Sequence, residues 1–157
     1  ERTPLNNPNA RGVFAQLEYA SGVNDLAQAV MEGIAFSLID GQLAFGDGAR
    51  GAIPMIGGGA RSRFFVRLIA SALGRPIERV AASEAGPAFG AARLARLALT
   101  GEAVAVVCRR PAIIETIDPE PDLEARYAER FSTFRALYAS IRRVREATAD
   151  RPPAATR

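Results

Sequence analysis

Three consecutive glycines, Gly57–Gly59, separate a short apolar run from an amphipathic stretch, and this junction constrains the fold more than any other feature. The run before them, Ile53–Ile56, suits a short buried strand, although Pro54 favours the start of a strand or an edge. Apolar residues then recur at helical spacing over Ser62–Leu73, and Gly74 ends that stretch. The pattern predicts a strand, a glycine turn and a helix in direct succession.

Helices and short strands alternate along the rest of the chain. Ile77–Ala81 is a second predicted strand, and Ala112–Ile117 is a predicted edge strand. Strands that alternate with helices imply parallel pairing, so the sequence predicts an α/β fold. Two or three short strands make a poor sheet, which suggests that further strands belong to it. The other predicted helices begin, in chain order, at Asn24, Gly86, Glu102 and Asp122.

Two local predictions concern these helices. Asn24 is placed to cap the first helix, because its side chain accepts hydrogen bonds from free amides in the first turn. The helix that follows Gly86 carries a face of small residues, which lets a helix approach a neighbouring element closely. The small residues of that face are Ala88, Gly90, Ala91 and Ala92.

The composition excludes several chemistries. All 20 basic residues are arginine, and there is no lysine or histidine. The chain therefore has no Walker lysine, no Schiff-base lysine, no Ser-His-Asp triad and no histidine metal site. Cys108 is the single cysteine, which rules out an internal disulfide and fits a reducing, cytoplasmic setting. The arginines are spread among acids, which argues against nucleic-acid binding, and no apolar run is long enough to span a membrane.

A glycine-rich junction between a strand and a helix suits nucleotide binding. Without side chains the backbone lets a ligand approach closely, and free amides at a helix start suit phosphate or ribose oxygens. Gly57, Gly58 and Gly59 lie at this junction, and Ser62 is placed to cap the helix. A tight turn without a ligand is one alternative. Another is a Rossmann dinucleotide site with Glu78 on a ribose hydroxyl, although the sixth position of that fingerprint is Ser62 and not glycine.

Four blocks of the chain resemble, in order and in spacing, the FGGY carbohydrate kinases: "ERTPLNNPNARGVF", "NDLAQAVMEGIAFSLIDG", "IGGGARSRFF" and "EAGPAFGAARLA". The resemblance covers residues 1–145 and is strongest to the xylulokinase branch. In that family two actin-like (ribonuclease-H-like) ATPase domains close around a cleft, with the sugar mainly on the N-terminal domain and ATP on the C-terminal one. The resemblance implies a C-terminal domain over 1–146, incomplete at its N-terminal edge where the first strands are missing, and a disordered tail at 147–157.

The resemblance implies an ATP-dependent kinase that transfers the γ-phosphoryl group to a pentulose hydroxyl, such as xylulose to xylulose 5-phosphate. Mg²⁺ and the sugar would be held mainly by the missing N-terminal part. No catalytic or metal-binding residue is assigned to this chain, and we expect the chain alone to be inactive. Unpaired sheet edges favour self-association, such as a homodimer. A non-catalytic actin-like interaction module is one alternative, and a Rossmann-type dinucleotide-binding fragment is the other. The implied cofactor-binding residues are Gly57, Gly58, Gly59, Ala60 and Ser62.

Other matched positions concern the surroundings of this site. Glu32 belongs to the second signature of the family and would lie on a helix that flanks the cleft. Arg67 and Ser71 stand where a glutamine and an aspartate are common in the family, and Gln16 stands where glycine is usual. These departures bear on the finer nucleotide contacts.

Overall fold

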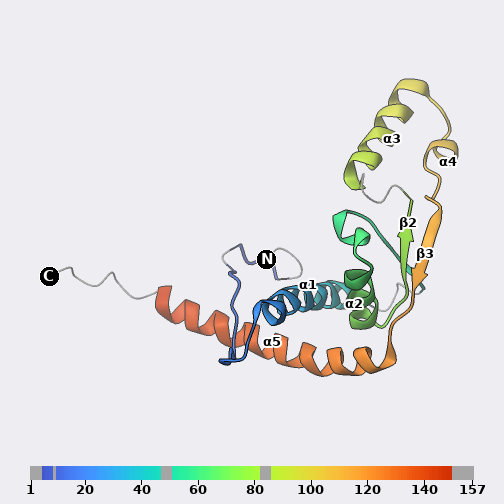
Figure 1. Ribbon diagram of the computed structural model, residues 1–157. Helices are drawn as coiled ribbons and strands as arrows, with labels where there is room; N and C mark the ends of the chain where they lie inside the picture. Colours follow the sequence, from blue (N-terminus) through green and yellow to red (C-terminus); the bar gives the residue numbers. More distant parts are fainter. Residues whose placement is uncertain (1–4, 9, 47–50, 82–85, 150–157) are drawn as a thin grey trace. The chain divides into compact units, whose positions relative to one another are not determined.

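The computed structural model describes residues 5–8, 10–46, 51–81 and 86–149. The chain divides into two compact units, the first made of Glu1–Gly46 with Ala125–Arg157 and the second of Asp47–Glu124. Long helices dominate the first unit, and a small sheet with shorter helices forms the second (Figure 1). Each unit is described by itself below.

Helix α1 (Val23–Phe45) belongs to the first unit. It begins after Gly22, whose backbone N–H donates to the carboxylate of Asp25 at 2.9 Å. Asn24 lies inside the first turn, so the prediction that it caps the helix is wrong. The acidic side chain at the third helical position reaches back to the chain entering the helix, and this contact replaces the predicted cap. Gly46, with a φ of 72°, ends the helix.

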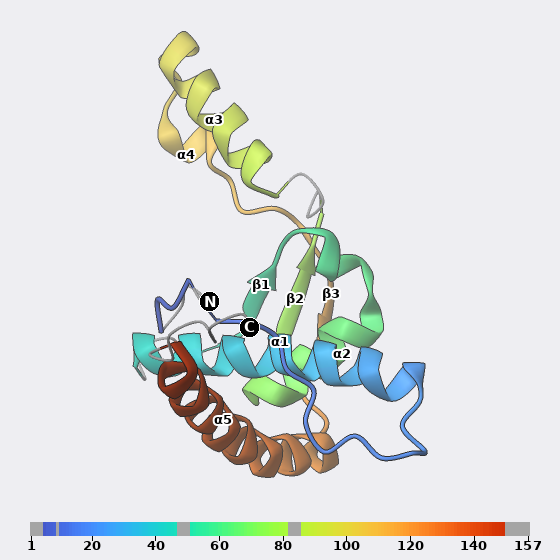
Figure 2. The same cartoon turned by 90° about the vertical axis from the view of Figure 1, so that its left-hand side faces the viewer.

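The core of the first unit lies between α1 and α5 (Pro121–Ala149), which run side by side in Figures 1 and 2. Phe36 of α1 is buried and contacts three aromatic rings of α5 at centroid distances of 5.5 to 6.1 Å. Aromatic pairs in tilted geometry add about 0.5–1.5 kcal/mol each beyond the area they bury. The last helix therefore presents an aromatic face to α1. The three rings belong to Tyr127, Phe131 and Phe134.

The second unit contains a sheet of three strands in the order β1 (Ile53–Met55), β2 (Ile77–Val80) and β3 (Ile113–Ile117), with β2 in the middle (Figure 2). β1 and β2 pair in parallel, as predicted, but β2 and β3 pair antiparallel. The chain leaves the end of β2 and returns at the same end, where Val80 pairs with Ile113, so β3 must run the other way. The α/β prediction is confirmed, with a mixed sheet in place of a parallel one.

Helix α2 (Arg63–Leu73) connects β1 to β2 and packs on the sheet. The side-chain oxygen of Ser62 accepts from the N–H of Phe65 at 3.2 Å, which caps the helix as predicted. Gly74 ends it in the left-handed conformation, with a φ of 60°. Helix α2 also buries aliphatic side chains against the sheet, and the burial of one such side chain stabilises a fold by roughly 1.5–3 kcal/mol. The buried apolar residues of α2 are Val66, Leu68, Ile69 and Ala70.

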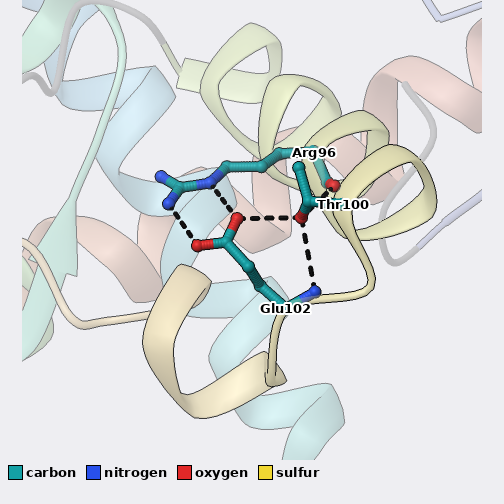
Figure 3. A network of polar contacts seen from close by, with 3 residues as sticks. All are labelled: Arg96, Thr100 and Glu102. Atoms are coloured by element: carbon teal, nitrogen blue, oxygen red, sulfur yellow. Dashed lines mark hydrogen bonds and ion pairs between the residues drawn. The ribbon is translucent and has the colours of Figure 1, made fainter.

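Helices α3 (Gly86–Thr100) and α4 (Val104–Val107) lie between β2 and β3 in sequence. α4 begins at Val104, later than the helix start predicted at Glu102. Glu102 instead bonds to the end of α3, where it accepts from Arg96 and Thr100 (Figure 3). No described residue of α3 is buried, so its small-residue face makes no close packing contact in the part of the chain that is described.

The last helix extends further than the sequence indicated. α5 runs to Ala149, so the tail predicted at 147–157 overlaps its last turn, and residues 150–157 lie outside the described part of the chain. Glu84, which a sequence reading could assign to the cap or flank of the helix after Gly86, also lies outside it. Among the described helices, none combines the length and the apolar character that crossing a bilayer requires.

Candidate functional site: the glycine loop after β1

The glycine loop forms a turn of its own between β1 and α2. Gly57 has a φ of 92°, a conformation that favours glycine, and residues Gly58–Arg61 form the 3-10 turn η1. The N–H of Ala60 donates to the carbonyl of Gly57 at 3.1 Å, and the N–H of Ser62 donates to the carbonyl of Gly59 at 3.2 Å. Two of the amides in the loop are therefore used inside it, which the sequence did not indicate.

The three glycines differ in the space around them. A β-carbon added at Gly57 or Gly58 would meet no heavy atom within 4 Å, so both face open space. A β-carbon at Gly59 would lie 3.0 Å from Cε of Met55 and 3.2 Å from the ring of Phe65. Gly59 is thus closely packed against Met55 and Phe65, whereas Gly57 and Gly58 form the open edge of the loop.

Ala60 and Ser62, the other two predicted site residues, also have structural roles. The Ala60 side chain is buried, with 1% of the residue exposed, and its carbonyl points to Arg79. Ser62 is exposed, but its hydroxyl already accepts the N–H of Phe65 in the first turn of α2. The structure therefore brings all five predicted residues into one turn, and the part of it open to a ligand is the backbone of Gly57 and Gly58 together with Ser62.

A charged cluster supports the loop, and the sequence did not reveal it. Nε of Arg79 donates to the carbonyl of Ala60 at 2.8 Å, and its Nη1 donates to Oε2 of Glu115 at 2.7 Å. Arg63, the first residue of α2, pairs with the other oxygen of Glu115. Hydrogen bonds from Arg79 and then from Arg63 hold the pKa of the Glu115 carboxyl below its ordinary value. Glu115 therefore stays ionised and links β3 to both arginines.

Two of the three residues that depart from the family pattern, Arg67 and Ser71, contact the segment before α5. Arg67 pairs with Glu120 at 3.1 Å, and the hydroxyl of Ser71 accepts the backbone N–H of Glu120 at 3.1 Å. Both interactions fix α2 to that segment and do not involve the glycine loop. Beside them lies a shallow pocket of about 290 Å³, lined by Arg63, Phe64, Arg67 and Ile117.

Two acidic residues considered from the sequence are engaged elsewhere. Glu78 of β2 pairs with Arg110, and successive side chains of a strand point to opposite faces, so Glu78 points away from the face on which its neighbour Arg79 reaches the loop. This geometry does not support the dinucleotide hypothesis, which requires Glu78 at the loop. Glu32 of α1 binds Arg130 of α5 in the first unit.

Cys108 and the acidic residues around the start of α5 lie outside the glycine loop. Cys108 is exposed at the end of α4. Asp118 and Glu120 lie in the turn before α5, and Asp122 lies in the first turn of that helix, where acidic side chains are favoured. Within the described ranges, no three of the His, Cys, Asp and Glu residues gather closely enough to hold a metal ion.

Comparison with known proteins identifies the class of this α/β chain. Residues 1–99 match the model of the FGGY family of carbohydrate kinases, C-terminal domain. The xylulose kinase of Escherichia coli (strain K12) is 38% identical over 144 residues, which cover 90% of this chain and 30% of that protein. The xylulose kinase of Klebsiella pneumoniae is 36% identical over 145 residues, with the same coverage. A solved structure described as a xyloylose kinase from Brucella ovis superposes with a TM-score of 0.77 at 37% identity, covering 90% of this chain and 30% of that one.

The chain therefore belongs to the FGGY family of carbohydrate kinases, as the four sequence blocks predicted. More particularly, its similarity to xylulose kinases extends over most of its length, in sequence and in structure. The chain spans about 30% of the length of the curated relatives it matches.

Proposed function

We propose that this chain supplies the ATP-binding side of a sugar kinase whose acceptor is a pentulose hydroxyl, with D-xylulose converted to xylulose 5-phosphate. One observation carries the proposal: an open glycine backbone at Gly57 and Gly58 in a chain that is 38% identical to a xylulose kinase. We assign residues 1–146 to an actin-like C-terminal domain whose sheet is completed by strands outside this chain.

The loop fits a nucleotide where it is open. Gly57 and Gly58 would let the nucleotide lie directly against the backbone, because no side chain or neighbouring atom fills that space. Gly59 and Ala60 would fix the shape of the loop from behind, and Ser62 would face the nucleotide at its exposed end. When bound, ATP supplies the phosphoryl group, and Mg²⁺ supplies positive charge that offsets the charge of the phosphates.

We further propose that the chain alone transfers no phosphoryl group. Phosphoryl transfer requires an acceptor oxygen placed in line with the γ-phosphorus, and a base or positioning group near that oxygen. The carboxylate of Glu115 lies close to the loop, but it forms ion pairs with Arg63 and Arg79 and is therefore not available as a base. We assign the acceptor base, the sugar site and most Mg²⁺ ligands to the part of the kinase that lies outside this chain. The cytoplasmic setting and the homodimer stay predictions.

Binding is tested by titrating the ¹⁵N-labelled chain with MgATP and, separately, with NAD. We expect MgATP to shift the amide signals of the loop residues 57–62 with a dissociation constant on the order of 1 mM, and NAD to leave them unchanged. The matched control is Gly58→Ala, which fills the open space at the loop without a clash in the free protein. Equal shifts with NAD, or MgATP shifts confined to other residues, would contradict the proposal.

The ATP-binding role is tested in a chimera in which this chain replaces the matched 144 residues of the E. coli xylulose kinase. We expect the chimera to phosphorylate D-xylulose with MgATP, whereas the chain alone gives no turnover. Circular dichroism establishes that the chimera is folded. A folded chimera that does not phosphorylate D-xylulose with MgATP would contradict the ATP-binding role proposed for this chain.

A further inference from the structure

Arg79 occupies an unusual position for a charged side chain. It lies in the central strand β2, directly opposite Glu115 of β3, and only 22% of its side chain is exposed. Its guanidinium spans two elements, since Nη1 bonds Glu115 and Nε bonds the carbonyl of Ala60 in the loop turn. One side chain therefore ties the glycine loop to two strands of the sheet.

The loop depends on such a tie because its open part is glycine. Gly57 and Gly58 have wide conformational freedom and no side chain with which to pack. Behind them, the packing of Gly59 on Met55 and Phe65 holds one side of the turn. The bond from Arg79 holds the carbonyl on the other side, and charge-assisted hydrogen bonds of this kind are stronger than neutral ones.

The tie also reaches the other end of the loop. Glu115, which holds Arg79, is bound through its second oxygen by Arg63. Arg63 is the first residue of α2 and directly follows Ser62. The carboxylate of Glu115 thus holds the turn η1 through Arg79 and the start of α2 through Arg63. The segment that carries the predicted site residues is therefore held at two points.

We propose that Arg79, oriented by Glu115, is a positioning residue that presets the glycine loop for nucleotide binding. This inference rests on the proposed function, because it gives the loop a ligand. A loop that is already ordered in its binding conformation loses less conformational entropy when the ligand binds, so its affinity is higher. Loss of Arg79 should leave the fold in place and loosen the turn at Ala60.

The same strand provides a matched control. Glu78, the neighbour of Arg79 in β2, forms an ion pair with Arg110 at 2.5 Å. That pair joins β2 to the segment before β3 and makes no contact with η1 in the described structure. Arg110→Met therefore removes an ion pair of the same chemical kind from the same strand, and separates a general loss of stability from an effect on the loop.

The experiment uses the full chain and compares the wild type with Arg79→Met, Arg79→Lys, Glu115→Gln and Arg110→Met. Amide hydrogen exchange at residues 59–62, thermal unfolding and titration with MgATP are measured for each. We expect Arg79→Met to raise exchange at these amides and the dissociation constant for MgATP by about tenfold, which corresponds to the loss of one hydrogen bond to a charged group. We expect Arg79→Lys to recover part of the amide protection and part of the affinity for MgATP. We expect Arg110→Met to lower the melting temperature as much as Arg79→Met does, but to change the amide exchange and the dissociation constant by no more than about twofold.

The outcomes separate the two proposals. Wild type that binds MgATP, together with Arg79→Met that binds it equally well, overturns the positioning role alone. Wild type whose loop signals do not respond to MgATP overturns the proposed function, and the positioning role with it. If Arg79→Met and Arg110→Met change amide exchange and MgATP affinity equally, Arg79 contributes only to general stability and the positioning role is overturned. If Arg79→Met does not fold, Arg79→Lys and Glu115→Gln, which preserve most of the shape of the cluster, decide between these outcomes.

Discussion

Nη1 of Arg130 lies 2.7 and 2.8 Å from the two carboxylate oxygens of Glu32, and this pair joins α1 to α5 across 98 residues of sequence. Only 9% of the Glu32 side chain is exposed, and Gln28 donates a further hydrogen bond to it at 2.8 Å. The Arg130 side chain is more open, with 47% exposed. The carboxylate is therefore the buried member of the pair and depends on its partner.

We expect Arg130→Met to lower the free energy of unfolding by about 2 kcal/mol. The substitution leaves the Glu32 carboxylate covered and without its cation, and the partial exposure of Arg130 keeps the loss below the 3–5 kcal/mol seen for fully buried pairs. Denaturation with urea, followed by circular dichroism, measures it. The matched control is Arg142→Met, which removes an exposed pair with Glu146 on α5 and should change stability by less than about 0.5 kcal/mol. Equal effects of the two substitutions would show that the Glu32 pair contributes no more than a surface ion pair.

Ser62 is assigned two roles, a structural one as the cap of α2 and a proposed one at the nucleotide site. Ser62→Ala removes the acceptor for the Phe65 N–H and should lower the free energy of unfolding by about 1 kcal/mol. Ser62→Asp preserves the cap but brings a negative charge to the loop. We expect this variant to remain as stable as the wild type and to bind MgATP at least about tenfold more weakly, because like charges repel.

Thermal unfolding and MgATP titration of both Ser62 variants test this separation. If Ser62→Asp binds MgATP as well as the wild type does, Ser62 lies away from the phosphates and has the capping role alone. Ser62→Thr, which preserves a hydroxyl acceptor, serves as the conservative control for the cap.

Gly58 and Gly59 are neighbours with opposite requirements, so alanine should affect them differently. Gly59→Ala places a β-carbon 3.0 Å from Met55 and 3.2 Å from Phe65, and we expect overpacking to lower stability by about 1–2 kcal/mol. Gly58→Ala meets open space and should change stability by less than about 0.5 kcal/mol while it weakens MgATP binding. Thermal unfolding and the same titration give both quantities. A destabilised Gly58→Ala with unchanged binding would reverse the assignment of the two glycines.

The elements that the sequence predicted correctly are those whose signals are local. The helix α2 is bounded by Ser62 and Gly74, a cap and a left-handed glycine that act within one turn of the helix they limit. The strands β2 and β3 were predicted from short apolar runs. The cap of α1 was missed because Asn24 and Asp25 are adjacent candidates, and the conformation of Gly22 decides between them.

The candidate site was predicted in its position and missed in its support. Three glycines indicate a backbone open to a ligand, but the packing of Gly59 depends on Met55 and Phe65 and cannot be seen in a pattern of glycines. The bond between Arg79 and Glu115 depends on the register of β3, which the chain reaches only after α3 and α4. Pairing over such distances is determined by tertiary structure, and no local spacing in the sequence indicates it.

We expect the exposed hydrogen-bond network at the end of α3 to contribute to stability in a pH-dependent way. Glu102 accepts from Nε and Nη2 of Arg96 and from the hydroxyl of Thr100 (Figure 3). The bonds from Arg96 and then from Thr100 lower the pKa of the Glu102 carboxyl from 4.5 to about 2. Because the folded state has the lower pKa, the network contributes fully above pH 4.5 and loses its contribution as the pH falls towards 2.

A pH titration followed by ¹³C NMR of the Glu102 carboxyl carbon measures this directly, with an expected midpoint near 2. Arg96→Met should raise the midpoint more than Thr100→Val does, since the bond from Arg96 is the larger cause of the shift. Arg93→Met is the matched control: it removes a cation from the same helix, one that donates to the carbonyl of Arg109 and leaves Glu102 its partners, so the midpoint should not move. A wild-type midpoint near 4.5, or an equal response to Arg93→Met and Arg96→Met, would mean that the network is not formed in solution and that net charge alone governs Glu102.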